Sequence, residues 1–348
     1  MRNTTIDIAK GIGILTVVLC HNWILYNDRG ELSRLVFSFH MPLFFFISGI
    51  FFKPSQSFLA LFKSKADGLL KPYFTTLISL TVVSVLFQHA SLKQELIRIL
   101  YGAGATLDWT PMWFLTHLFL VYLVAWVLYK SILLITKNRL WQQILLALIY
   151  FIGVFNPQTF WEKDVEFYGV RQLVFGQQQN LLGLPFNADI LLITVPIFLF
   201  GFIWAKQLNS HDFKLEHTLT VLAVFFLLHY FFNETIELNA RQFGQPIICT
   251  LQIVLGIYSV FGISKLLSRY ELVAKVLAYL GSASLFILIF HFSFQHRLTG
   301  ILQYYFHDKL LLMASIGFVV SILFSLFVYE VVRKISFLSQ LMLPTKSK

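Results

Sequence analysis

Long runs of apolar residues, separated by short polar segments, dominate the chain from end to end. Runs of this length are typical of helices that cross a lipid bilayer, and ten of them lie near residues 6–26, 35–53, 69–88, 113–135, 140–156, 188–206, 217–233, 247–267, 274–295 and 310–332. The fifth and seventh are short for a bilayer, and the ninth begins among polar residues. The pattern predicts an all-α polytopic transmembrane bundle of about ten spans. We expect one integral-membrane domain over residues 1–348.

The composition supports a membrane protein. Of the 348 residues, 57% are hydrophobic and 13% are charged, whereas soluble domains contain about 25% charged residues. The two cysteines, Cys20 and Cys249, both lie inside apolar runs. They are therefore interpreted as small buried apolar residues, not as a disulfide framework.

The charged residues between the apolar runs predict the orientation of the helices. A net charge of +10 can indicate nucleic-acid binding, but here the cations lie in short loops between spans, where they set topology. Alternate loops are rich in lysine and arginine, as in residues 53–71, 130–139 and 265–275. Loops near 206–216 and 297–309 fit this alternation poorly. We therefore expect both termini in the cytoplasm, a lipid bilayer as partner, and no nucleic acid.

The first apolar run carries three ionisable residues on one stripe. Lys10 and His21 are eleven positions apart, so they point the same way on a helix and differ in height by about 16 Å, with Asp7 within about 40° of their face. Ionisable groups inside a membrane helix are costly and usually face a cavity or the protein interior. A histidine there can act as a general base, because its imidazole is largely neutral at pH 7.

Four further histidines fall in the predicted outer half of the membrane, namely His40, His117, His229 and His291. Together with His21 they suggest a polar cavity that opens outward. A core histidine bonded to a backbone carbonyl is the better interpretation of His40, His117 and His229. The chain has no HExxH motif and no short-spaced His/Cys cluster, so we expect no metal site. Residues 157–187 form the longest loop, either a lid or acceptor-binding loop or a solvated connector.

Several segments in order along the chain resemble the membrane-bound acyltransferase 3 family, and most closely its fucose 4-O-acetylase-like branch. They are the first run with Asp7, Lys10 and His21, then SFHMPLFFFISGIFF at 38–52, Lys-Pro-Tyr at 71–73, WTPMWFL at 109–115 and GSASLFILIFH at 281–291. The resemblance implies a surface-polysaccharide O-acetyltransferase in the bacterial inner membrane. The family's first-span signature is an arginine, ten residues and a histidine. Here Lys10 keeps the positive charge but lacks the bidentate guanidinium.

The resemblance also implies acetyl-CoA as the acyl donor and a glycan or lipid-linked sugar as the acceptor. His21 would deprotonate the acceptor hydroxyl or carry the acyl group itself, with Asp7 holding Lys10 and with His291 as a second catalytic candidate. The donor's phosphates would meet lysines on the cytoplasmic side, for which the candidates are Lys10, Lys63, Lys65 and Lys71.

Two other classes of function remain open. Intramembrane Asp, Lys and His also build proton relays in transporters, although the chain lacks the two related halves that many transporters show. A glycan export component without chemistry is the other alternative.

Overall fold

A computed structural model describes residues 4–22, 30–155, 183–306 and 309–345. The packing divides the chain into two compact units, each assembled from separate stretches of sequence. The first contains Met1–Ile50, Ile203–Glu237 and Phe243–Val331, and the second contains Phe51–Phe202, Leu238–Gln242 and Val332–Lys348. The expectation of a single domain over residues 1–348 stays a prediction. The predicted lid loop at 157–187 lies outside the described residues except for 183–187.

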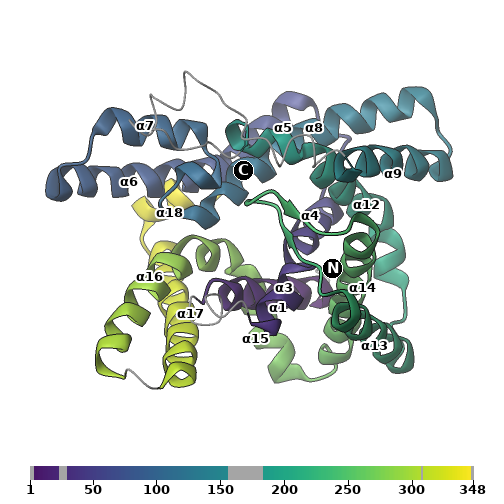
Figure 1. Cartoon of the computed structure of the whole chain (residues 1–348). Helices are drawn as coiled ribbons and strands as arrows, with labels where there is room; N and C mark the ends of the chain where they lie inside the picture. Colours follow the sequence, from purple (N-terminus) through teal and green to yellow (C-terminus); the bar gives the residue numbers. More distant parts are fainter. Residues whose placement is uncertain (1–3, 23–29, 156–182, 307–308, 346–348) are drawn as a thin grey trace. The chain divides into compact units, whose positions relative to one another are not determined.

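Regular structure in the described part is helical apart from two strands of two residues each, β1 (Ile236–Glu237) and β2 (Gln242–Phe243). The all-α prediction is therefore confirmed. The helices of the first unit, coloured purple and green to yellow in Figure 1, are α1 (Thr4–Cys20), α3 (Glu31–Phe37), α4 (His40–Ile50), α13 (Leu215–Phe232), α14 (Pro246–Leu267), α15 (Glu271–Ser282), α16 (Ser284–Tyr305) and most of α17 (Leu310–Lys334).

The second unit contains α5 (Phe58–Lys65), a π-helical turn (Ala66–Leu70), α6 (Lys71–Gln88), α7 (Leu92–Tyr101), α8 (Trp113–Ile135), α9 (Arg139–Phe155) and α18 (Ser336–Met342). Short 3-10 turns lie at Gly104–Thr106, Thr110–Met112 and Pro185–Ile190. Helix α12 (Leu191–Ser210) begins in this unit and ends in the first. Helix α7 was not expected from the sequence, because three of its ten residues are charged and it contains no long apolar run.

Eight helical stretches in the described part are long and apolar enough to cross a membrane. They are Glu31–Ile50, Phe58–Gln88, Thr110–Ile135, Pro185–Leu208, Leu215–Phe232, Pro246–Leu267, Ser284–Tyr305 and Leu310–Lys334. Helices α1 and α9, which correspond to the first and fifth predicted runs, have 17 residues each. At about 1.5 Å per residue, each is somewhat short of the hydrocarbon thickness of a bilayer. The fold is that of a multi-pass membrane protein.

The ninth predicted span, 274–295, had the wrong bounds: the candidate span in this region is Ser284–Tyr305. The helix breaks at Ala283, whose backbone leaves the helical region (φ −90°, ψ 2°), and the two halves become α15 and the start of α16. The hydroxyl of Ser282 donates to the carbonyl oxygen of Tyr279, which satisfies one acceptor at the end of α15. The residues at the break, 281–284, are small, and apolar residues continue on both sides of it because α15 packs against α1, so hydrophobicity alone did not reveal the break.

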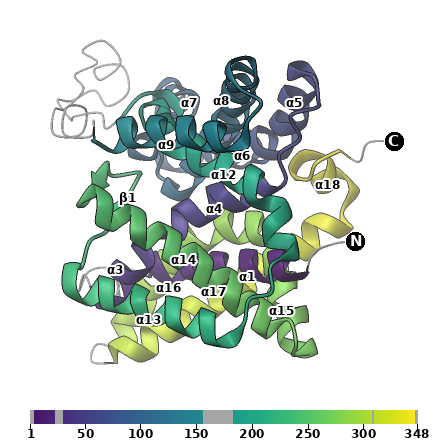
Figure 2. The same ribbon diagram turned by 90° about the vertical axis from the view of Figure 1, so that its right-hand side faces the viewer.

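Helix α1 is the centre of the first unit. It packs against α3, α4, α14, α15 and α16, and Figures 1 and 2 both show it beside α15. Glycines allow this close approach, because a Cβ on Gly11 would collide with the carbonyl of Leu277, and one on Gly281 with the carbonyl of Asp7. The central position of α1 fixes both of its ends inside the unit.

Candidate functional site

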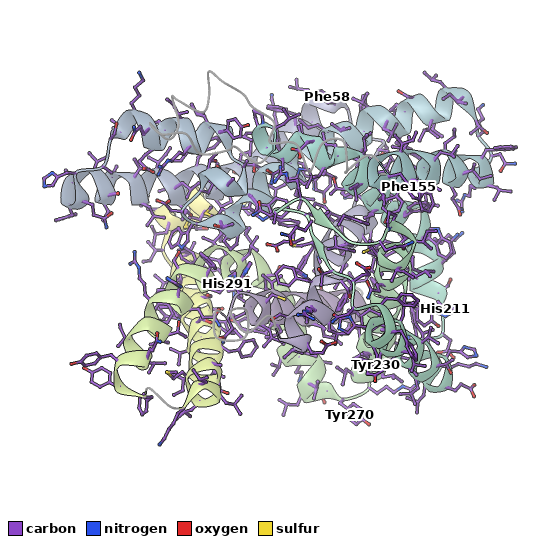
Figure 3. The ribbon with its side chains drawn as sticks, in the orientation of Figure 1. Phe58, Phe155, His211, Tyr230, Tyr270 and His291 are labelled. Carbon is purple, nitrogen blue, oxygen red and sulfur yellow. The ribbon has the colours of Figure 1, made fainter. Side chains whose placement is uncertain are left out.

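Two histidines from distant parts of the chain meet where α1 ends. His21 follows the last residue of α1, and its backbone N–H still bonds to the carbonyl of Val17 at 3.1 Å. Its ring lies against that of His291 on α16, with centroids 5.2 Å apart and planes inclined by 14°, and Figure 3 labels His291. The edge of Phe292 meets the His21 ring at 5.4 Å. Of the predicted site residues, these two are brought into direct contact.

The hydrogen bonds of His291 define which of its nitrogens is available. Nδ1 lies 2.6 Å from the carbonyl oxygen of Ile287 and 3.1 Å from that of Leu288. Because carbonyl oxygens only accept, Nδ1 must carry the proton, and in the neutral ring Nε2 then keeps its lone pair. Nε2 is buried and has no hydrogen-bond partner among the described residues. The site therefore contains a proton acceptor that the fold itself does not use.

The two histidines differ in their access to solvent. His291 is fully buried, whereas His21 keeps part of its surface accessible. His40 is a further electrostatic neighbour of His21, but its Nδ1 bonds to the carbonyl oxygen of Val36 at 3.0 Å. A substrate can therefore approach His21 more readily than His291.

Two buried amide side chains complete this region. Asn22 follows His21, and its Nδ2 donates to the carbonyl oxygen of Ala314 on α17 at 2.8 Å, while its Oδ1 has no partner among the described residues. Gln295 lies one turn after His291 on α16 and is fully buried. Neither its Nε2 nor its Oε1 has a partner in the described part of the chain. Sequence reasoning missed both amides, because an amide in a helix gives no chemical signal by itself.

Asp7 and Lys10 lie near the other end of α1. Asp7 is buried, and its carbonyl packs against Gly281 of α15. Lys10 is partly exposed, and its Cβ also lies on the Gly281 side. The stripe predicted from the sequence is thus a helix with charged groups at its start and a histidine pair at its end.

A small cleft of about 50 Å³ lies beside the first turn of α1, lined by Thr5, Ile6, Leu208, His211, Phe213, Phe261 and Lys265. The imidazole of His211, labelled in Figure 3, lies 3.3 Å from the hydroxyl of Tyr258 through its Nε2. Lys265 is the cation of the lining. Sequence reasoning missed this cleft because its residues come from three separate segments of the chain.

The other lysines predicted to bind the donor belong to the second unit. Lys71 forms an ion pair with Asp67 at 2.6 Å and approaches the hydroxyl of Thr345 at 3.4 Å. The ammonium group of Lys65 lies over the ring of Tyr122, 3.8 Å from its centroid. Lys63 is exposed in the last turn of α5. Lys63 is therefore the most accessible cation of the three.

The remaining predicted histidines have structural partners. His117 bonds through Nδ1 to the carbonyl oxygen of Phe186 and through Nε2 to the hydroxyl of Thr194, both at 2.9 Å. His229 lies 2.8 Å from a carboxylate oxygen of Glu31 through its Nε2. The contact with Phe186 agrees with the core interpretation of His117, whereas His229 contacts a carboxylate and not the expected backbone carbonyl.

A buried ion pair holds together the second unit near His117. Arg241 donates through Nε and Nη2 to the two carboxylate oxygens of Asp189, both at 2.9 Å, and Nη2 also reaches Asn187 Oδ1 at 2.9 Å. Nearby, the hydroxyl of Tyr101 donates to the carbonyl oxygen of Gly183 at 2.7 Å. Burial and the charge of Asp189 raise the pKa of Tyr101, so it stays a donor. Asp189 also accepts from the backbone N–H of Leu184, so both members of the Arg241–Asp189 pair are held by other parts of the unit, which marks the pair as structural.

Comparison with known proteins gave one match. A family model for an acyltransferase domain matches residues 3–330, which is nearly the whole chain. No curated protein and no solved structure matches. The roles of individual residues therefore rest on the geometry described above.

Proposed function

Because the chain belongs to the acyltransferase 3 family of membrane proteins, we propose that it is an O-acetyltransferase of surface glycans. In this proposal the acetyl group passes from cytoplasmic acetyl-CoA to a hydroxyl of a polysaccharide or lipid-linked sugar. The protein would reside in the bacterial inner membrane with both termini in the cytoplasm, and would belong to the fucose 4-O-acetylase-like branch. The family membership and the multi-pass fold are established; the donor, the acceptor, the branch and the residue roles are the proposal.

The observation that supports this chemistry best is the contact between His21 and His291 at the end of α1. In the proposed step, His21 takes the proton of the acceptor hydroxyl while the hydroxyl oxygen attacks the thioester carbonyl carbon. A tetrahedral intermediate forms and collapses with cleavage of the C–S bond. The departing thiolate then recovers the proton from the imidazolium of His21. Atoms and charge balance without a metal or an oxidant.

His291 supports His21 in two ways. Its ring lies parallel to that of His21 and limits the orientations that His21 can take. Its buried Nε2 lone pair is a second acceptor near the reacting atoms. The alternative, in which His21 carries the acetyl group on a ring nitrogen, uses the same geometry and requires an acetyl-imidazole intermediate.

The donor would enter at the opposite end of α1. Asp7 and Lys10 lie there, and so does the cleft that contains Lys265 and His211. Lysine ammonium groups bind phosphates as point charges, and the CoA moiety carries several phosphates. Lys63, Lys65 and Lys71 of the second unit remain candidates for the same role, with Lys63 the most accessible. The acyl chain would then extend along α1 toward His21.

Release of free CoA thiol by the purified protein in nanodiscs tests the proposal. We expect thiol release from acetyl-CoA that depends on an added glycan acceptor and that disappears in the His21→Ala variant. Full activity in His21→Ala would overturn the role of His21. If the protein releases no thiol but moves a solute in response to a proton gradient, the transporter alternative is correct. A glycan export component would do neither.

A further inference from the structure

Gln295 is a fully buried amide whose two polar atoms have no partner among the described residues. We propose that its Nε2–H group donates a hydrogen bond to the acyl carbonyl oxygen as that oxygen becomes negatively charged during transfer. This inference rests on the proposed function. It places the carbonyl oxygen of the acyl group next to Gln295, in the same site as His21 and His291. It makes Gln295 an oxyanion-stabilising residue.

The position of Gln295 follows from the helix that carries it. Gln295 and His291 are four residues apart on α16, so their side chains lie on one face at successive turns. His291 in turn contacts the ring of His21. The face of α16 that meets the end of α1 therefore presents an imidazole and an amide to the same region.

The lack of partners is the physical argument for a ligand. Buried amides in folded proteins are almost always hydrogen-bonded, because burial without a partner loses the bonds that water would make. The helix that carries Gln295 packs closely on α17, because the rings of Phe294 and Phe324 stack with centroids 4.1 Å apart. The missing partners of Gln295 are therefore not the result of a loosely packed helix. A substrate carbonyl would supply the missing acceptor.

Other polar groups nearby are already committed. The Nδ2 of Asn22 donates to the carbonyl oxygen of Ala314, so the group of Asn22 that stays available is its Oδ1, which can only accept. The hydroxyl of Thr299 lies 2.8 Å from the backbone carbonyl of Gln295 itself. An oxyanion needs donors, and of these three residues Gln295 has the amide N–H groups that no described residue engages. Gln295 transfers no proton in this scheme; it stabilises charge while His21 moves the proton.

The test compares Gln295→Leu and Gln295→Glu with wild type in the full-length protein in nanodiscs, by steady-state thiol release and thermal unfolding. Loss of one oxyanion donor typically lowers kcat by about 10²-fold or more. We expect this loss in Gln295→Leu, with KM values for acetyl-CoA and the acceptor unchanged and with no decrease in Tm. The carboxylate of Gln295→Glu would oppose the developing negative charge and should lower kcat at least as far.

Gln252→Leu provides a matched control. Gln252 on α14 is also fully buried, and both of its polar atoms also lack partners among the described residues, but the proposal gives it no role. We expect its kcat to stay near that of wild type. An unchanged kcat in Gln295→Leu overturns the inference, as does an equal loss in Gln252→Leu or a loss accompanied by a lower Tm.

The outcomes also separate this inference from the proposed function. If wild type is active and His21→Ala is inactive while Gln295→Leu is fully active, only the role of Gln295 is wrong. If wild type itself releases no thiol, the proposed function and the inference both fail. If Gln295→Leu does not fold, the kcat of Gln295→Glu is the test, provided that its Tm is normal. A strongly lowered kcat supports the inference and an unchanged kcat overturns it.

Discussion

Gly281 of α15 lies directly against the backbone carbonyl of Asp7 in α1, where a Cβ would collide with the carbonyl oxygen. Gly11 makes the reciprocal approach to the carbonyl of Leu277. Two helices that are over 250 residues apart in sequence are thus held close by the absence of side chains. This contact fixes the position of α1, and with it the position of His21 at the far end of the helix.

Substitution of Gly281 by alanine tests the importance of this packing. Because the obstacle is backbone, which cannot rotate away, we expect destabilisation of about 1–3 kcal/mol and a lower Tm in detergent. Gly300→Ala is the control, since Gly300 lies in α16 with no atom within 4 Å of a Cβ. There alanine should leave stability equal or higher by up to about 1 kcal/mol. Equal Tm values for the two variants would show that the α1–α15 contact tolerates an added methyl group.

Removal of the His21 imidazole should abolish most of the acyl transfer. General-base catalysis contributes about 10²- to 10⁴-fold, so His21→Ala should lower kcat by that factor while the protein still inserts and folds. His291→Ala should lower kcat less, because His291 contacts His21 and is not the group accessible to solvent. His89→Asn is the control, because His89 is exposed and asparagine tolerates its positive φ of 55°. A His89→Asn defect as large as that of His21→Ala would point to a nonspecific effect.

Mutation of the lysines near the start of α1 should change donor binding more than turnover. We expect Lys10→Ala and Lys265→Ala to raise the KM for acetyl-CoA. The difference from wild type should be smaller at high salt, because salt screens the lysine–phosphate attraction in the wild-type protein as well. Lys10→Arg should retain donor binding, since arginine keeps the charge and adds a bidentate donor. Lys137→Ala, which removes an exposed cation outside the proposed donor site, serves as the control. A KM for acetyl-CoA that is unchanged in both alanine variants would exclude these two lysines as donor contacts.

The Arg241–Asp189 pair should stabilise the second unit. Its side chains are 3% and 12% exposed, and removal of one partner of a buried pair typically costs about 3–5 kcal/mol. We therefore expect Arg241→Met to lower Tm strongly, and Arg241→Lys to do so less, because lysine keeps the charge but not the two parallel hydrogen bonds. Lys275→Met removes an exposed ion pair with Glu271 and should leave Tm unchanged. Similar Tm values for Arg241→Met and wild type would mean that the pair contributes little.

The apolar pattern was sufficient to predict the long apolar helices, but not the amphipathic helix α7 or the point at which one apolar run breaks. Eight of the ten predicted runs correspond to helical stretches long enough to span a bilayer, and the other two to α1 and α9. The ninth differs in its bounds, because the predicted run covers the end of α15 and the start of α16, two helices that meet at Ala283. Lipid and a neighbouring helix are equally apolar surroundings, so hydrophobicity cannot distinguish a span from a helix packed on α1.

The sequence by itself determined that the protein is a helical membrane protein and that His21 is an unusual residue, because burying an imidazole in an apolar helix is costly and shows in the composition of a single segment. Only the tertiary structure decided what His21 contacts. His291 is 270 positions away, Gln295 becomes notable only through its lack of partners, and Arg241 pairs with a residue 52 positions earlier. Such contacts depend on how helices pack against one another, and no local periodicity records them.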